Sequence, residues 1–170
     1  MVIAIAAISL DGCIAFNSTD PVSWGSKEDK QLFASETKKS GVVVMGRTTW
    51  ETINRPLSDR HIIVLTTRPK HYQSPSSTVE FTNLPPIQLI KKLKSRNFSD
   101  IFIAGGNQIY TLFLNEKLVD QIWITIEPYL IGHPAINLLS KIINPPIKLT
   151  FIKSKLLNDN TLHLKYRILY

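Results

Sequence analysis

The sequence contains one cysteine, Cys13, among 170 residues. A single cysteine cannot form a disulfide within its own chain, which excludes a disulfide framework and fits a reducing compartment. Long hydrophobic runs are missing too. The apolar run over residues 2–8 is too short to cross a bilayer, and no basic segment of a secretion signal precedes it. We therefore expect a cytoplasmic protein without a membrane partner.

Acidic residues are fewer than basic ones, 13 against 20, so the formal net charge is +7. Such a surface suits nucleic acid or a polyanionic small molecule. The basic residues are scattered, however, and no aromatic-interleaved stripe or helix-turn-helix pattern accompanies them. The four histidines show no metal-ligand spacing. We expect small anionic ligands, no nucleic acid, no metal, and a monomer or weak homodimer. A non-catalytic nucleic-acid-binding module is the least favoured alternative.

Apolar runs predict the fold. Four of them are apolar on both faces, as strands between two helical layers are, and they cover residues 2–8, 42–45, 62–65 and 101–104. Helical patterns cover residues 26–38, 86–94 and 107–114. Later strand-like segments cover residues 122–126, 149–155 and 162–170, with a turn at 158–160. We predict one α/β domain over residues 1–170, with a central, mostly parallel twisted sheet flanked by helices and a C-terminal antiparallel hairpin.

Small and hydroxyl residues follow three of these strands. The strand-end segments are Gly46-Arg47-Thr48-Thr49, Thr66-Thr67-Arg68 and Gly105-Gly106-Asn107-Gln108. Ligands of open α/β sheets bind at the carboxyl ends of strands, and helix N-termini there favour phosphate. The arginines and threonines could grip an additional phosphate, such as the one that distinguishes NADP from NAD. Ordinary turn and capping chemistry is the alternative for each segment alone, and a G-x-G-x-x-G fingerprint is missing.

One carboxylate points toward the predicted core. On a helix that starts at Ser26, Asp29 lies on the same face as Leu32 and Phe33. A carboxylate on a buried face is costly unless it meets a partner, and a heterocycle with a ring N–H and an exocyclic amine is one such partner. A capping box that begins at Ser26 is the alternative, and the two roles are compatible.

One block is specific enough to suggest a family. It comprises residues 44–53, VMGRTTWETI, and residues 55–60, RPLSDR. Together with residues 5–14, Trp24, Asp29, Phe33, residues 103–106, Tyr110 and Thr125, this block resembles dihydrofolate reductase over nearly the whole chain. The resemblance implies NADPH as cofactor and reduction of 7,8-dihydrofolate, with hydride transfer to pterin C6 and protonation of N5.

The resemblance also implies roles for single residues. Asp29 would hold the pterin and promote its protonation, and Thr125 would support Asp29. Arg60 would clamp the glutamate carboxylate. The other substrate contacts it implies are Ile5, Ala7, Phe33, Ile53 and Tyr110. The cofactor contacts it implies are Ala7, Ile14, Gly46, Arg47, Thr48, Thr49, Leu65, Thr66, Thr67, Arg68, Ala104, Gly105, Gly106, Asn107, Gln108 and Tyr110.

Other segments resemble a sister family, the pyrimidine reductase domain of riboflavin synthesis. They are residues 9–12, SLDG, residues 24–29, WGSKED, and residues 127–132, EPYLIG. That family would reduce a ribosylamino-pyrimidine phosphate with NADPH, and Lys30 or Arg60 could then hold the phosphate. We favour dihydrofolate because the block over residues 45–60 fits it better.

Overall fold

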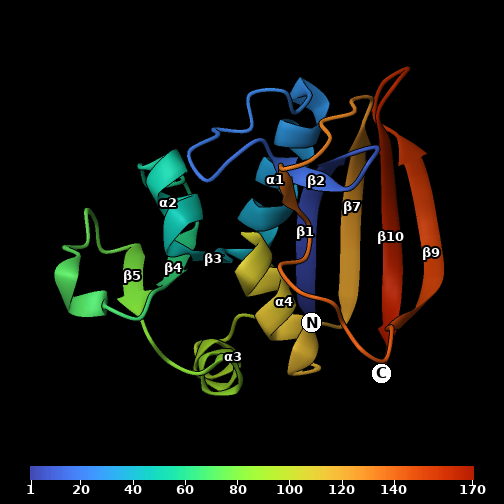
Figure 1. The fold of residues 1–170 in the computed structure, drawn as a ribbon. Helices are drawn as coiled ribbons and strands as arrows, with labels where there is room; N and C mark the ends of the chain where they lie inside the picture. Colours follow the sequence, from blue (N-terminus) through green and yellow to red (C-terminus); the bar gives the residue numbers. More distant parts are fainter.

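The computed structural model describes residues 1–170 and contains ten strands, four α-helices and one 3-10 turn (Figure 1). The strands are β1 (Val2–Ser9), β2 (Cys13–Ala15), β3 (Val42–Gly46), β4 (His61–Leu65), β5 (Val79–Thr82), β6 (Ile101–Ile103), β7 (Gln121–Glu127), β8 (Ile136–Asn137), β9 (Lys148–Leu156) and β10 (Leu162–Leu169). The helices are α1 (Lys27–Ser40), α2 (Arg47–Ile53), α3 (Pro86–Ser95) and α4 (Asn107–Asn115), and the 3-10 turn is η1 (Pro69–His71).

Eight strands form one sheet in the order β5-β4-β3-β6-β1-β7-β10-β9. The strands from β5 to β7 pair in parallel. β10 pairs antiparallel with both β7 and β9, which places the C-terminal hairpin at one edge of the sheet (Figure 1). The predicted mostly parallel sheet with a terminal antiparallel hairpin is thus confirmed.

Helices cover both faces of the parallel part, and this explains why the strands are apolar on both sides. On one face, Val42 and Val44 pack with Leu89 of α3 and Phe113 of α4. On the other face, Val43 packs with Trp50 of α2, and Phe33 of α1 contacts the same cluster. Alternate residues of one strand therefore belong to two cores, as the side-chain period of a strand requires.

The structure adds short elements that the sequence did not predict. They are β2, β5, β8 and η1. β2 pairs only with β8, so these two short strands form a small second sheet. No helix is both long and apolar enough to cross a membrane.

Candidate functional site

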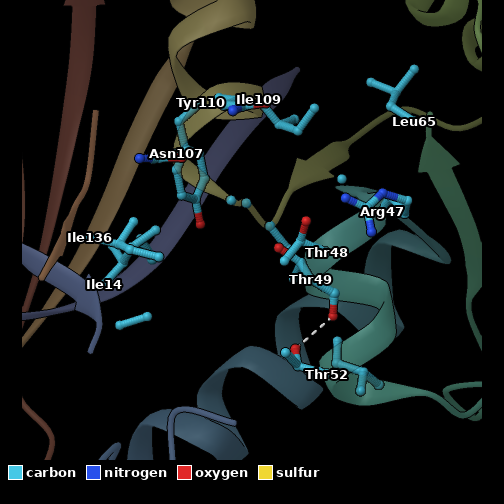
Figure 2. A pocket seen from close by; sticks show the side chains of 18 of the residues that line it. Ile14, Arg47, Thr48, Thr49, Thr52, Leu65, Asn107, Ile109, Tyr110 and Ile136 are labelled. Carbon is cyan, nitrogen blue, oxygen red and sulfur yellow. Dashed lines mark hydrogen bonds between the residues drawn. The ribbon is translucent and has the colours of Figure 1, made fainter. Parts of the chain in front are cut away.

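A cavity of about 920 Å³ opens at the carboxyl ends of the parallel strands (Figure 2). Residues from β1, β3, α1, α2 and α4 line it, together with the segment between β2 and α1. Its position agrees with the general rule that ligands of open α/β sheets bind beyond the carboxyl ends of the strands. Ile14 and Ile136 lie on one side of the cavity, and Arg47, Thr48 and Thr49 lie on the other (Figure 2).

All three strand-end segments meet in this cavity. Every predicted residue of two segments lines it, and so do Thr66 and Thr67 of the third, together with the preceding Leu65. Gly46 and Gly106 are the N-cap residues of α2 and α4, and neither helix has a side-chain cap. The two turns are also joined, because the Gly46 N–H donates a hydrogen bond of 2.7 Å to the Gly105 carbonyl. Uncapped amides of two helix starts thus lie on one wall of the cavity.

Two of these glycines have no room for a side chain. A Cβ atom built on Gly46 would lie 2.9 Å from Cγ1 of Ile109. Gly105 has a φ of +97°, and a Cβ there would lie 3.2 Å from the Tyr110 hydroxyl oxygen. Both positions therefore require glycine, and the turns line the cavity with backbone at these points, which fits a ligand with phosphate groups.

A second part of the cavity is mostly apolar. Ile5, Ala7, Phe33 and Ile53 line it, as does Tyr110. The Tyr110 hydroxyl donates a hydrogen bond of 2.6 Å to the Ile5 carbonyl. Burial, followed by the charge of Asp29, raises the pKa of Tyr110 well above its usual value. The Tyr110 side chain is therefore neutral and held in place by this hydrogen bond, between the strand-end turns and the apolar part of the cavity.

Asp29 extends from the first turn of α1 into the apolar part of the cavity. Burial raises the pKa of this carboxyl, and the negative charge of Glu127 raises it further. Hydrogen bonding from Thr125 and the charge of Lys30 oppose that rise. The Asp29 N–H also donates to the Ser26 hydroxyl at 3.1 Å. Ser26 therefore caps the helix while the Asp29 side chain faces the cavity, but the second bond of a capping box is not formed, because the Ser26 N–H donates to Glu127 at 2.8 Å.

Thr125 lies behind Asp29 and does not line the cavity itself. It is buried on β7, and its hydroxyl lies 3.0 Å from Nδ1 of His163. Burial, followed by the charge of Lys165, lowers the pKa of His163 to about 4. The sequence assigned no role to His163, because its proximity to Thr125 depends on the pairing of β10 with β7.

Two predicted arginines lie outside the cavity. Arg60, predicted to clamp a carboxylate, is buried, and its guanidinium donates to the Ser58 carbonyl at 3.0 Å and to the Thr37 hydroxyl at 2.9 Å. Arg68 is exposed and precedes η1. The sequence could not predict this difference, because long flexible side chains turn toward whichever partners the fold provides. Arg47 is the one arginine that lines the cavity.

The segment between β2 and α1 forms part of the cavity wall. Asp20 holds this segment through hydrogen bonds of 2.8 Å from the Phe16 and Val22 amides. The other lining residues that the sequence did not single out as site residues include Asn17, Ser18, Pro21, Thr52, Asn83 and Ile136. Lys30, which the sequence named only for the pyrimidine phosphate, also lines the apolar part. No group of three or more His, Cys, Asp or Glu residues is placed to hold a metal ion.

Known proteins resemble this chain in sequence. The family model described as dihydrofolate reductase matches residues 1–128. A Caenorhabditis elegans protein with the provisional name of a dihydrofolate reductase is 37% identical over 134 residues, which are 71% of this chain and 68% of that protein. The dihydrofolate reductase of Mycoplasma genitalium is 31% identical over 127 residues, which are 74% of this chain and 76% of that protein.

Solved structures resemble the fold. A pyrimidine reductase-like protein of Corynebacterium diphtheriae superposes with a TM-score of 0.78 at 17% identity, over 99% of this chain and 92% of that one. The dihydrofolate reductase of Enterococcus faecalis in complex with NADP(H) superposes with a TM-score of 0.74 at 20% identity, over 99% of this chain and 96% of that one. Both enzyme types thus share this architecture.

Proposed function

Since this chain belongs to the dihydrofolate reductase family, we propose that it reduces 7,8-dihydrofolate to 5,6,7,8-tetrahydrofolate with NADPH. The observation that carries the proposal is the position of Asp29, a carboxylate with a raised pKa in the apolar part of a large cavity. The strand-end turns of the same cavity suit a cofactor with several phosphates.

The turns after β3, β4 and β6 would hold the cofactor. The uncapped amides that follow Gly46 and Gly106 would donate to its phosphate oxygens. Arg47, Thr66 and Thr67 would bind the additional phosphate of NADPH, without help from Arg68. When bound, NADPH would supply a hydride from nicotinamide C4 to pterin C6. Tyr110 and Ala104 would lie against the nicotinamide.

The apolar part would hold the pterin ring. Ile5, Ala7, Phe33 and Ile53 would contact its faces and exclude water. The two carboxylate oxygens of Asp29 would accept hydrogen bonds from a ring N–H and the neighbouring exocyclic amine. This pairing would orient the ring for hydride transfer.

Asp29 would also promote protonation of N5, through water. A carboxyl serves as a proton donor near neutral pH only when its pKa is raised, and burial raises it here. Thr125, which is buried on β7, would orient the Asp29 carboxyl from the side that faces away from the cavity. Since Arg60 is buried and does not line the cavity, we assign it no substrate contact, and Lys30 is the cation that would meet a substrate carboxylate.

Lys30 also supports a second candidate, reduction of a ribosylamino-pyrimidine phosphate. Lys30 follows Asp29 directly and lines the cavity, and its exposed ammonium donates to the Ser23 carbonyl at 3.4 Å. From there the ammonium would bind a phosphate as readily as a carboxylate. The two candidates share the cofactor and differ in the ring that Asp29 would hold.

One assay separates the candidates. NADPH consumption by the purified protein is followed by absorbance with dihydrofolate or with the pyrimidine phosphate as the second substrate. We expect consumption with dihydrofolate, and Lys30→Met should raise KM more than it lowers kcat. Consumption with the pyrimidine alone would replace the first candidate by the second. Consumption with neither, combined with binding to DNA that weakens steeply with salt, would favour the binding module.

A further inference from the structure

Glu127 is a buried carboxylate that the proposed chemistry leaves unused. It is the last residue of β7, and it is 1% exposed. One carboxylate oxygen accepts hydrogen bonds of 2.8 Å from both the amide and the hydroxyl of Ser26. The other accepts a hydrogen bond of 3.1 Å from the Thr161 hydroxyl. All three donors are neutral, so this buried negative charge is stabilised by hydrogen bonds without a cation.

These contacts connect Glu127 to Asp29. Ser26 is the N-cap of α1, and its hydroxyl accepts the Asp29 N–H at 3.1 Å. Glu127 also follows Thr125 by two positions on β7, so both side chains project from the same face of the strand. Thr125 interacts with the Asp29 carboxyl, and Glu127 holds the turn that carries it.

We propose that Glu127 is a positioning residue that fixes the first turn of α1 through its hydrogen bonds to Ser26 and acts on the Asp29 carboxyl through its negative charge. The catalytic consequence rests on the proposed function, whereas the effect on Asp29 itself does not. If Glu127 only connected β7 to α1, its hydrogen bonds would be sufficient and its charge would not affect Asp29. An effect of the Glu127 charge on the Asp29 carboxyl therefore distinguishes the proposal from a purely structural role.

Three charged or titratable groups face Asp29. Glu127 on β7 raises its pKa, and Lys30 on α1 lowers it. Tyr110 on α4 is neutral near pH 7 as an ordinary tyrosine is, and burial and Asp29 raise its pKa further. Glu127 is therefore the negative group that acts on the Asp29 carboxyl, and removing its charge should make Asp29 easier to ionise.

The test is a titration of the Asp29 carboxyl by ¹³C NMR in the protein without substrate. Glu127→Gln keeps an acceptor for Ser26 and removes the charge. In the Glu127→Gln variant, we expect the midpoint pH of the Asp29 titration to fall by roughly half to one pH unit. Glu28→Gln is the matched control, because Glu28 adjoins Asp29 in sequence but accepts from Asn158 at 3.0 Å on another side of the helix. Its midpoint should equal that of the wild type.

An unchanged midpoint in a folded Glu127→Gln variant would overturn the proposal. If that variant does not fold, Glu127→Asp takes its place, since it keeps the charge and shortens the reach to Ser26. We then expect hydrogen exchange at the Ser26 and Asp29 amides to accelerate at least about tenfold, and an unchanged rate would be the contrary result. A shifted midpoint without any turnover of dihydrofolate would refute the proposed function and leave the role of Glu127 intact.

Discussion

The Asp29→Asn variant keeps the size of the side chain and removes its exchangeable carboxyl proton. The only acidic residues that line the cavity are Asp20 and Asp29, and Asp20 is occupied by the Phe16 and Val22 amides. No second carboxyl of the cavity is therefore free to replace Asp29. Loss of a general acid typically costs 10²–10⁴-fold, and we expect about 10³–10⁴-fold here, which corresponds to about 4–5 kcal/mol of activation free energy.

Single-turnover oxidation of bound NADPH by dihydrofolate, measured between pH 5 and pH 9, is the assay for this variant. The deficit should be smallest at acidic pH, where solvent protons replace the missing donor. NADPH affinity should change less than about twofold, because Asp29 lies apart from the strand-end turns. A hydride-transfer rate within about threefold of the wild type at pH 7 would refute the role of Asp29.

The same variant also tests the raised pKa of Asp29, because that pKa makes the stability of the wild type depend on pH. A raised pKa in the folded state means that the native protein binds this proton more tightly than the unfolded chain does. The ionised carboxyl therefore destabilises the fold as the pH rises through the folded-state pKa. Because asparagine stays neutral, Asp29→Asn should have the higher Tm at pH 8, and the difference should vanish below the ordinary pKa of aspartate. A lower Tm at pH 8 would contradict this reasoning.

Three further variants test other parts of the account. Gly46→Ala should weaken NADPH binding at least about tenfold in a fluorescence titration, because its Cβ would lie 2.9 Å from Ile109, and Gly46→Ala/Ile109→Ala should recover most of the loss. Arg60→Ala should lower the free energy of unfolding in urea by about 1–3 kcal/mol and leave the KM for dihydrofolate nearly unchanged, whereas a tenfold higher KM would return Arg60 to the substrate site. Phe113→Ala should cost about 3–5 kcal/mol, because Phe113 is 0% exposed, and a cost under about 1 kcal/mol would contradict its place in the core.

The sequence predicts those strands of the sheet that have a clear apolar pattern of their own. Val42–Gly46 and His61–Leu65 form strands that are buried almost throughout, and their unbroken apolar runs required two covering layers. Val79–Thr82 escaped prediction because its alternating pattern is only four residues long, and the strand forms by pairing with β4. β2 and β8 have too few residues for any periodic pattern and exist through their pairing with each other.

The cavity is predictable to the extent that it follows from strand ends. Gly46, Thr66 and Gly106 come together because parallel strands end at one edge of the sheet. The environment of Asp29 depends instead on contacts across the chain. Glu127 holds Ser26 from 101 positions away, and the only local signal was an acid directly after an apolar strand.

The direct test of the central claim is a crystal structure of the protein with NADP⁺ and folate. We predict that both carboxylate oxygens of Asp29 lie about 3 Å from the ring nitrogen and exocyclic amine of the pteridine, with the nicotinamide against its C6 edge. A pteridine bound elsewhere, or held in the cavity without any contact to Asp29, would contradict the account.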